Sequence, residues 1–573
     1  MAATVVPPPA AETPSASSAL WRDRALVAAV AIVASIAGIA NGFVFDDVPQ
    51  VAENARVQDL SRIGEILTSP YWPPPYAPEL FRPVASITVA LQYMFGFGEP
   101  VLFRVVSYVL YALVAVGVLS LAKRFLPRSI ALGVGVLFAA DPLHVEAVAL
   151  AVNQGELIVA LTAVAATIRY VDRRRTGALS PGDWALLTAL FVLGALSKEN
   201  GFVIPGLLAA AELFLIDDAP LRDRVRSVSR GYATLAAAAV AMLAVRALVL
   251  SGNVAGAVPA KAIAGLSLGG RLLTMLQIVP RWVRLLAWPA HLQIDYSPNE
   301  IVASTAFGMY EAAGLVLLVT FAAIAWLSRR RAPVVTFGLA WCAIALFPVS
   351  NIVPTGIVLA ERTLFLPSVG FLLALGGAVD FLLQRDEVRT RSLRLSLAGA
   401  CGALACVGVV RSDFRHRTWA NGQTMWEAAA IDAPKSLRVQ QAHNDAIADI
   451  TRDFENAAQQ SPTPWRVQFE LGTLLRYMRA DSAALTQLRK SLAARPDQHD
   501  AALELSATLI SVGDYAAAKE IAARIQSAGD TARVAATFMR IADSASRVGA
   551  PPGSIRVMAR DEFAPATRNG REH

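Results

Sequence analysis

Pairs of charged residues stand at the ends of several apolar runs, and they are the side chains in this sequence with the clearest chemical potential. They are Asp46 with Asp47, Lys198 with Glu199, and Glu361 with Arg362. An acid beside a cation can be an ion pair that only holds helices together. Alternatively, the cations face an anionic group of a ligand and the acids orient them. Both roles fit the mixed pairs, and the two adjacent aspartates could equally be solvated charges.

Further ionisable groups lie beside other apolar stretches. Arg82 precedes Pro83, and a planar guanidinium suits a phosphate held by two hydrogen bonds. His144 and Glu146 lie where one apolar run ends and the next begins, and Glu156 follows shortly after. Ionisable groups at membrane depth are costly and usually face a cavity or a partner. A lone histidine is more often structural, but beside Glu146 this one becomes a candidate for the wall of an active site.

The elements that must position these residues are apolar helices. Of the 573 residues, 55% are hydrophobic and 17% are charged, and the mean hydropathy is +0.46. This composition is too apolar for a soluble globular protein. Several uncharged runs, such as 25–40, 105–121 and 364–379, approach the roughly 20 residues that cross a bilayer as a helix. The sequence therefore predicts an all-α, polytopic integral membrane protein.

Short basic loops separate the apolar runs and indicate their orientation. The net charge of +7 is spread over these loops rather than over one face of a soluble domain, which favours a topology signal over nucleic-acid binding. If the basic loops are cytoplasmic, the chain crosses the membrane an even number of times between them. This predicts a cytoplasmic N-terminus and about eleven spans, near 25–41, 101–122, 129–141, 154–169, 183–197, 201–216, 231–250, 311–327, 334–350, 364–383 and 395–411.

Composition and topology divide the chain into four parts. They are a disordered N-terminus (1–20), a transmembrane domain (21–415) with external loops 42–100 and 251–310, a soluble helical region (416–550) and a disordered tail (551–573). An odd number of spans places the soluble region on the extracytoplasmic side. The apolar stretch 272–290 is interrupted by Pro280 and Arg281, and a span there would place Arg329 to Arg331 outside. We therefore predict an amphipathic or re-entrant helix at 272–290.

The soluble region repeats weakly with a period of about 34 residues. Phe469-Glu470-Leu471 corresponds to Leu503-Glu504-Leu505, and Asp481-Ser482-Ala483-Ala484 corresponds to Asp514-Tyr515-Ala516-Ala517. Small residues alternating with leucine at this period are typical of tetratricopeptide hairpins. Such hairpins stack into solenoids whose concave surface binds peptides.

The motifs follow one another in an order that is more specific than any of them alone. They are Phe45-Asp46-Asp47, Asn54, Arg82-Pro83, Pro142 to Val148, Lys198-Glu199, Pro289, Asp295-Tyr296-Ser297, Glu361-Arg362, Leu366 to Phe371, and the repeat region. This order resembles the transmembrane and tetratricopeptide-repeat-containing O-mannosyltransferases and their bacterial relatives, roughly over residues 41–530. The chain has Phe45, Asp141 and Gln154 where relatives usually have Trp, His and Arg. The implied donor sugar is therefore mannose or another hexose.

The resemblance implies a fold and a mechanism. The fold is that of C-type glycosyltransferases, helical membrane enzymes that use a polyprenyl-phosphate sugar and invert the anomeric carbon in one displacement. Asp46, or otherwise Asp47, would be the general base on the acceptor hydroxyl, while Arg82, Lys198 and Arg362 would stabilise the departing phosphate. The residues implied in acceptor or sugar binding are His144, Glu146, Glu156, Glu199, Glu361 and Asp295.

Three hypotheses about function follow. The leading one is transfer of sugar to Ser or Thr hydroxyls of polypeptides at the outer face of a bacterial inner membrane, with the repeat region binding the polypeptide. The second keeps the chemistry but has a lipid or cell-envelope glycan as acceptor, and the repeats then bind a partner protein. The third, a non-catalytic scaffold, does not explain why ionisable residues gather on one side. A transporter would collect its acids near the bilayer midplane instead.

The expected ligands follow from the leading hypothesis. Membrane lipid, the lipid-linked donor and a polypeptide are expected partners, and nucleic acid is not. No cofactor beyond the donor is required. A divalent metal is possible but not predicted, because the acids are too sparse for a cation cage.

Overall fold

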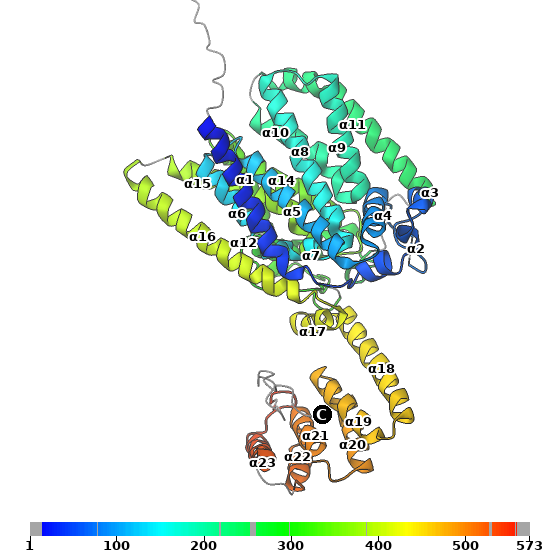
Figure 1. The fold of residues 1–573 in the computed structure, drawn as a ribbon. Coiled ribbons are helices and arrows are strands. Elements are labelled where there is room, and N and C mark those ends of the chain that lie inside the picture. The colour runs from blue at the N-terminus through cyan, green and yellow to red at the C-terminus, as the bar shows by residue number, and fades with distance from the viewer. Residues whose placement is uncertain are drawn as a thin grey trace, which may run out of the picture. The chain divides into compact units, whose positions relative to one another are not determined.

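The computed structural model describes residues 14–76, 78–216, 219–252, 259–296, 298–384, 387–525, 530–555 and 557. These residues fold almost entirely as helices (Figure 1), and the only β pairing among them is an isolated bridge between Pro298 and Ile301. The all-α prediction is confirmed. Residues 1–13 of the predicted disordered N-terminus, most of the predicted tail 551–573 and the motif residue Ser297 lie outside the described residues.

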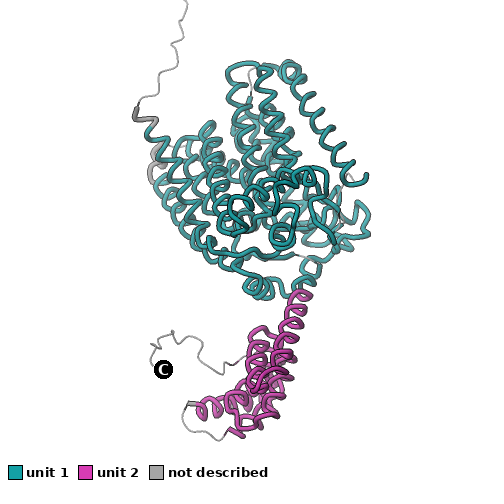
Figure 2. Tube along the Cα trace, turned by 45° about the vertical axis from the view of Figure 1, so that its right-hand side comes forward, with its two compact units in different colours: residues 1–439 teal, residues 440–573 magenta. Residues whose placement is uncertain are grey.

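The chain forms two compact units, residues 1–439 and 440–573, which Figure 2 colours separately. The helices of unit 1 are α1 (Pro14–Ser35), α2 (Ala55–Gln58), α3 (Ile63–Thr68), α4 (Pro83–Gly96), α5 (Pro100–Ala122), α6 (Arg128–Ala139), α7 (Val145–Ala149), α8 (Gln154–Thr176), α9 (Pro181–Ser197), α10 (Ile204–Leu215), α11 (Leu221–Val249), α12 (Leu268–Ala287), α13 (Met309–Ser328), α14 (Pro333–Leu346), α15 (Phe365–Leu383), α16 (Glu387–Arg417) and α17 (Gly422–Asp432). Helix α18 (Leu437–Gln460) continues into unit 2.

Each of the eleven segments predicted to span the membrane contains a helix. By length and composition, six helices among the described residues could cross a membrane, or seven if α6 and the bent segment Pro142–Ala149 form one span. The segments Pro181–Ser197 and Pro333–Val349 are apolar but shorter. The count of eleven spans stays a prediction.

The stretch predicted to be amphipathic or re-entrant is helix α12, which continues through Pro280. Met275, Ile278, Trp282 and Leu285, three or four residues apart, are all buried. This spacing places one apolar stripe on the helix, as an amphipathic helix requires. The stripe packs with the segments around Leu292 and Leu364 in a core of its own.

Local sequence explains where several helices begin. Proline is the first residue of α4, α5, α9 and α14, a position where its missing N–H is not needed. Helix α9 adds a capping box, because Ser180 and Asp183 bond each other's backbone N–H groups. Each of these helices begins directly after a turn that connects it to the preceding segment. Because the start of the helix is fixed, the residues of that turn are also held in place.

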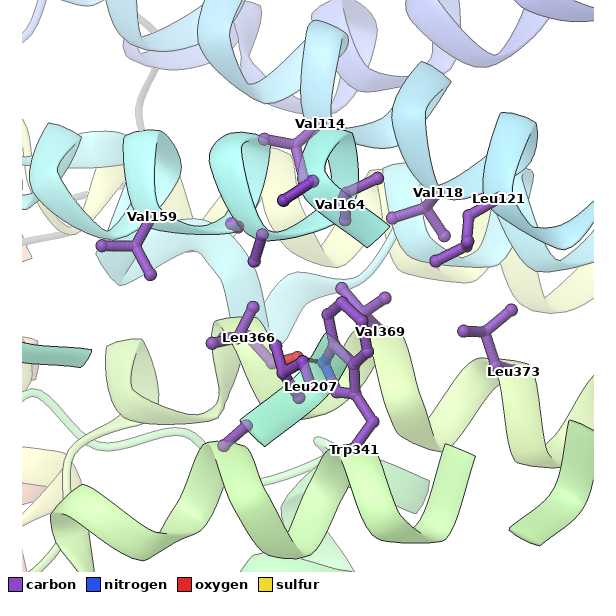
Figure 3. Packing of buried hydrophobic residues seen from close by; sticks show 14 of the residues in the cluster. Val114, Val118, Leu121, Val159, Val164, Leu207, Trp341, Leu366, Val369 and Leu373 are labelled. Atoms are coloured by element: carbon purple, nitrogen blue, oxygen red, sulfur yellow. Dashed lines mark hydrogen bonds between the residues drawn. The ribbon is translucent and has the colours of Figure 1, made fainter. Parts of the chain in front are cut away.

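The centre of unit 1 is packed from α5, α8, α10, α14 and α15 (Figure 3). Trp341 of α14 is fully buried, and its indole N–H donates to the Leu366 carbonyl at 2.9 Å. A Cβ atom on Gly338 of α14 would lie 2.4 Å from the Gly370 carbonyl oxygen of α15. Only glycine allows this close crossing. The tight packing fixes α15 and therefore the short helix Glu361–Leu364 that precedes it.

After α18, the described part of unit 2 contains two successive helical hairpins and a further helix. They are α19 (Pro464–Tyr477) with α20 (Asp481–Ala494), α21 (His499–Val512) with α22 (Tyr515–Ala523), and α23 (Asp530–Val548). A Cβ atom on Gly472 of α19 would lie 2.6 Å from Leu488 of α20, so a small residue is required at this crossing. The assignment of these hairpins as tetratricopeptide repeats stays a prediction.

Candidate functional site

The two adjacent aspartates lie in the turn after α1, where the backbone takes an unusual conformation. Phe45 has a φ of 53°, in the left-handed region that non-glycine residues rarely occupy. Its ring packs against Trp426 at 6.0 Å, and the guanidinium of Arg438 lies 5.9 Å from its centre. Strain of this kind persists only where the surroundings impose it and is common at functional sites. After this left-handed residue, Asp46 and Asp47 lie in different environments.

Asp47 is fully buried and held on every side. It accepts hydrogen bonds from the backbone N–H groups of Ala151 at 3.0 Å and Val152 at 2.9 Å, and it pairs with Arg104 at 3.3 Å. Burial raises the pKa of Asp47, which would suit a general base, but the same burial denies access to a substrate. Its geometry is that of a structural clamp between the α1 turn and the segment before α8.

Asp46 is half-buried, and within the described ranges it makes no hydrogen bond or ion pair. Both Arg362 and Tyr71 nevertheless lie close enough to interact with it electrostatically. Asp46 is therefore an accessible carboxylate with unused lone pairs beside a cation, which are the properties that a base acting on a bound hydroxyl requires.

The three predicted cations come from separate segments and each meets an acid. Arg82, just before α4, bonds Glu199 through two nitrogens, at 2.9 and 2.7 Å. Lys198, at the end of α9, lies 2.8 Å from Glu156.

Arg362, in the short helix Glu361–Leu364, holds Glu146 through its backbone and its side chain together. Its backbone N–H donates to this carboxylate at 2.8 Å, and its guanidinium donates to the other oxygen. The carboxylates predicted to bind substrate therefore orient the cations directly.

These ion pairs form one cluster. Lys198 interacts electrostatically with both Arg82 and Arg362, and Arg362 also interacts with Glu156. The structure thus brings together seven of the predicted site residues: Asp46, Arg82, Glu146, Glu156, Lys198, Glu199 and Arg362.

The cations keep hydrogen-bond donors to spare. Between 12% and 15% of each cationic side chain is exposed. Toward the residues that the structure describes, Nη1 of Arg82 and both Nε and Nη2 of Arg362 make no hydrogen bond. The cluster can therefore accept an additional anion without breaking the pairs that orient it.

Three residues that the sequence analysis did not assign also belong to this region. Arg246 of α11 is a second partner of Glu199, at 3.0 Å. Tyr71 is buried under the Arg82 guanidinium, 5.1 Å from its ring centre. Arg104 is the clamp partner of Asp47. A signal existed for the two arginines, because Arg104 is the only charged residue of α5 and Arg246 is the only one in the apolar part of α11, 231–249.

His144 is in the interior rather than at the cluster. It is 1% exposed, and its two ring nitrogens lie 3.1 Å from the Tyr111 hydroxyl and 2.9 Å from the Ser368 hydroxyl. The rings of Phe138 and Phe365 pack against it at 4.5 and 4.7 Å. The geometry favours a structural role, in which His144 joins α5 to α15.

Glu361 and Asp295 belong to a second polar network. Glu361 is fully buried and accepts hydrogen bonds from Tyr296 at 3.0 Å and from the Gln293 N–H at 2.5 Å. Asp295 accepts from Ser436 at 2.7 Å and pairs with Arg438 at 3.5 Å. The Glu361 contacts join the loop after α12 to the short helix Glu361–Leu364, and the Asp295 contacts join the same loop to the start of α18. Neither acid therefore offers a free carboxylate to a substrate.

The ionisation of Glu199 makes the stability of the folded protein depend on pH. Burial opposes ionisation of Glu199, but Arg82 and Arg246 outweigh it and lower its pKa from 4.5 to about 2. The unfolded chain therefore binds this proton at higher pH than the folded chain, and the stabilisation is complete above pH 4.5 and lost as the pH falls to about 2. We expect Glu199→Gln to lower the thermal midpoint in detergent at pH 7, with the difference from wild type shrinking below pH 4.5.

A matched control is Glu65→Gln, which removes an exposed helical ion pair with Arg62. Exposed pairs contribute little stability, so this variant should follow wild type throughout. A difference between Glu199→Gln and wild type that does not change with pH would contradict the prediction.

Metal binding was not predicted from the sequence, and no group of three or more His, Cys, Asp or Glu residues in the described part of the chain is arranged to hold a metal ion. The acids of the cluster are each engaged by a cation instead, apart from Asp46.

Curated relatives of the chain are protein O-mannosyl-transferases. The chain is similar to human protein O-mannosyl-transferase TMTC3, with 23% identity over 456 residues that cover 72% of this chain and 47% of that protein. It is also similar to human protein O-mannosyl-transferase TMTC4, with 24% identity over 479 residues, 74% of this chain and 64% of that protein. The chain thus spans about half the length of TMTC3. The predicted resemblance to this family is confirmed.

No protein-family model matches the chain. Among solved structures, the archaeal oligosaccharyltransferase AglB from Archaeoglobus fulgidus, in complex with an inhibitory peptide and a dolichol-phosphate, aligns with a TM-score of 0.44 at 15% identity, over 73% of this chain and 58% of that one.

Proposed function

We propose, from the similarity to protein O-mannosyl-transferases, that this chain is a membrane glycosyltransferase that moves a hexose from a polyprenyl-phosphate donor to Ser or Thr hydroxyls of polypeptides. The reaction takes place on the extracytoplasmic side with inversion at the anomeric carbon. The donor sugar is mannose or another hexose.

One observation supports this proposal above the others. Within a cluster of ion pairs, Asp46 alone has no hydrogen-bond partner among the described residues, while the cations beside it keep spare donors. Transfer of a sugar from a phosphate to an alcohol needs both the free carboxylate and the cations. A carboxylate must accept the hydroxyl proton, and fixed cations must face the phosphate.

The proposed step is a single displacement. The acceptor hydroxyl gives its proton to an Asp46 oxygen as its own oxygen forms the new bond to the anomeric carbon. The bond between that carbon and the phosphate oxygen breaks, and the phosphate keeps the electron pair. Arg82, Lys198 and Arg362 stabilise the resulting negative charge, and they are already oriented by Glu199, Glu156 and Glu146.

Asp47 and Arg104 act indirectly in this scheme. By fastening the α1 turn to Ala151 and Val152, Asp47 holds Asp46 in its accessible position. Tyr71, packed under Arg82, keeps that guanidinium from turning away. We regard these three as positioning residues.

The test is a transfer assay with the purified chain. The protein receives radiolabelled polyprenyl-phosphate mannose, or the glucose analogue, together with Ser/Thr peptides and with a membrane lipid extract. We expect label in the peptide fraction, on hydroxyl oxygen and with inverted configuration. Label found only in the lipid or glycan fraction would instead support the alternative acceptor, and no transfer from either donor would contradict the proposal.

A further inference from the structure

A single segment of unit 1 contacts both halves of the candidate site. This segment, residues 415–439, comprises the end of α16, helix α17 and the start of α18 (Figure 1), and we call it the connector. It contacts the turn after α1, which carries Asp46, and the short helix Glu361–Leu364, which carries Arg362. None of the predicted site residues lies in the connector. Any influence of the connector on the site must therefore act through these contacts.

The connector holds the turn after α1 by two hydrogen bonds to its backbone carbonyls and by one aromatic pair. The contacts are the Asn41 side-chain amide to the His416 carbonyl at 2.8 Å, the Gly42 N–H to the Ala420 carbonyl at 3.0 Å, and the Phe45 ring to the Trp426 ring at 6.0 Å. Phe45 directly precedes Asp46, and the buried Asp47 directly follows it. The backbone of Asp46 is therefore fixed on one side by the connector and on the other by the contacts of Asp47.

The connector reaches the phosphate-binding side of the site through Arg415. The Arg415 guanidinium pairs with Glu361 at 3.5 Å and with Asp432 of α17 at 3.1 Å. Gln293 bonds the same two residues, because its N–H donates to the Glu361 carboxylate at 2.5 Å and its side-chain amide donates to the Asp432 carbonyl at 2.7 Å. Glu361 directly precedes Arg362. These contacts therefore fix the backbone from which the Arg362 side chain extends.

The connector shares a hydrophobic core with the turn after α1. Trp419 and Met425 of the connector are fully buried, and they belong to one cluster with Val44 of the turn and with Ala151 and Val152, which bind Asp47. Protein interiors are packed as densely as organic crystals, so they transmit a displacement instead of absorbing it. A change in the connector is therefore expected to shift the turn as well.

The two halves of the site depend on this support. Asp46 makes no hydrogen bond to the residues that the structure describes, so its direction is set by the backbone of its turn. Asp46 and Arg362 lie close enough to interact electrostatically. A displacement of about 1 Å between reacting groups can cost about 10²-fold in rate. A segment that holds both residues at once therefore controls a spacing on which the proposed transfer depends.

We propose that the connector sets the spacing between Asp46 and Arg362, and that Trp426 and Arg415 are positioning residues for sugar transfer. Each of the two acts on the site residue through that residue's neighbour in the chain, which it contacts directly. The inference rests on the proposed function where it concerns transfer. The position of Asp46 itself is measurable without transfer.

The first test is Trp426→Ala in the full chain. Trp426 is half-buried, so the variant is expected to fold. Among folded molecules, kcat should fall at least about tenfold, because Asp46 loses its support, while KM for the lipid donor stays within about twofold, because the cations keep their places. Trp426→Phe retains an aromatic ring against Phe45 and should stay close to wild type. The measurement is the initial transfer rate at varied donor concentration.

The matched control is Phe125→Ala. Phe125 is also half-buried and also makes an aromatic contact, with Phe337 at 6.5 Å, but it lies beyond the end of α5 that is opposite Arg104. This variant should keep the kcat and KM of wild type. A loss of kcat in Phe125→Ala equal to that in Trp426→Ala would mean that any lost aromatic contact slows transfer, and the inference would be wrong.

Arg415→Gln should change the other kinetic constant. Without its guanidinium, the segment that carries Arg362 is less well fixed, so KM for the donor should rise at least about fivefold and polyprenyl phosphate should bind correspondingly more weakly. Arg415→Lys keeps the charge beside Glu361 and should lose less. An unchanged donor KM in folded Arg415→Gln would overturn the role of Arg415.

A thiol reagent measures the position of Asp46 without any transfer. Alanine replaces Cys342, Cys401 and Cys406 in the full chain, and Asp46→Cys then supplies the single thiol. Because thiol reactivity follows exposure and local charge, adding Trp426→Ala should change the rate of modification by a water-soluble reagent at least about threefold, whereas adding Phe125→Ala should not.

The outcomes separate the inference from the proposed function. The inference is wrong if Trp426→Ala leaves the modification rate unchanged, or if folded Trp426→Ala transfers sugar with the kcat of wild type. If the wild-type chain transfers no sugar, the proposed function fails, and the modification rate alone decides whether the connector positions Asp46.

Discussion

Asp46→Asn should slow sugar transfer by orders of magnitude while leaving the protein folded. The variant keeps the size of the side chain but removes the proton-accepting charge, and loss of a general base costs about 10²–10⁴-fold in rate. Because Asp46 makes no hydrogen bond to the described residues, its substitution breaks no structural contact. We expect the thermal midpoint to stay within about a degree of wild type, and the measurement is initial transfer rate beside thermal unfolding in detergent.

The adjacent residue supplies the matched control. Asp47→Asn should lower the thermal midpoint, because it leaves the fully buried Arg104 without its acid and weakens the bonds to Ala151 and Val152. Breaking one side of a buried ion pair costs about 3–5 kcal/mol. Among molecules that remain folded, transfer should fall less than in Asp46→Asn. If Asp47→Asn instead abolished transfer at unchanged stability while Asp46→Asn remained active, Asp47 would be the base.

The difference between these two aspartates shows where sequence reasoning ends. Hydropathy locates α1 and predicts that both acids follow it, because a helix in lipid must be long and uncharged. Which acid turns inward depends on the left-handed backbone of Phe45 and on the N–H groups of the segment before α8. Neither feature is local to the Asp-Asp pair, so the base could be narrowed to two residues but not to one.

The cluster of cations was easier to predict than its pairing. Arg82, Lys198 and Arg362 stand out because charge beside an apolar run is costly and needs a reason. Their partners depend on the tertiary fold, since Glu146 and Arg362 are separated by 216 positions and Arg82 and Glu199 by 117. Lys198 and Glu199 are neighbours in the sequence, and the sequence names no partner for either, whereas the structure pairs Lys198 with Glu156 and Glu199 with Arg82.

The same limit explains the other predicted acids. Asp295 and Glu361 are residue types that occur in binding sites, but in the structure Asp295 pairs with Arg438 and Glu361 with Arg415. Both arginines lie in or beside the region predicted to be soluble. Of that predicted region (416–550), residues 416–439 belong to unit 1 in the structure. The sequence of α17 is that of an ordinary soluble helix, so it does not predict where the helix packs. Its contact with the turn at Phe45 is a tertiary contact between distant parts of the chain.

Arg362→Met should reduce transfer by about 10²–10³-fold, the cost of removing one preorganised donor from developing charge. Arg362 is the predicted phosphate-binding cation that interacts electrostatically with Asp46, the proposed base. Two of its guanidinium nitrogens make no hydrogen bond to the described residues, so they can bind the phosphate. Arg362→Lys retains the charge but not the planar fork, so an intermediate loss is expected. The measurement is kcat/KM for the lipid donor, with donor competition by free polyprenyl phosphate.

Arg174→Met is the control that separates charge from stability. Arg174 and Glu212 form a buried ion pair at 2.8 Å, with both side chains 5% exposed. Arg174 lies near the end of α8 opposite Glu156, about 27 Å away along the helix axis. Its loss should destabilise the fold as much as the loss of Arg362 or more, but the folded fraction should keep normal donor affinity. Equal losses of donor affinity in Arg174→Met and Arg362→Met would mean that Arg362 acts through stability, and the phosphate would then have to be assigned to Arg82 and Lys198 alone.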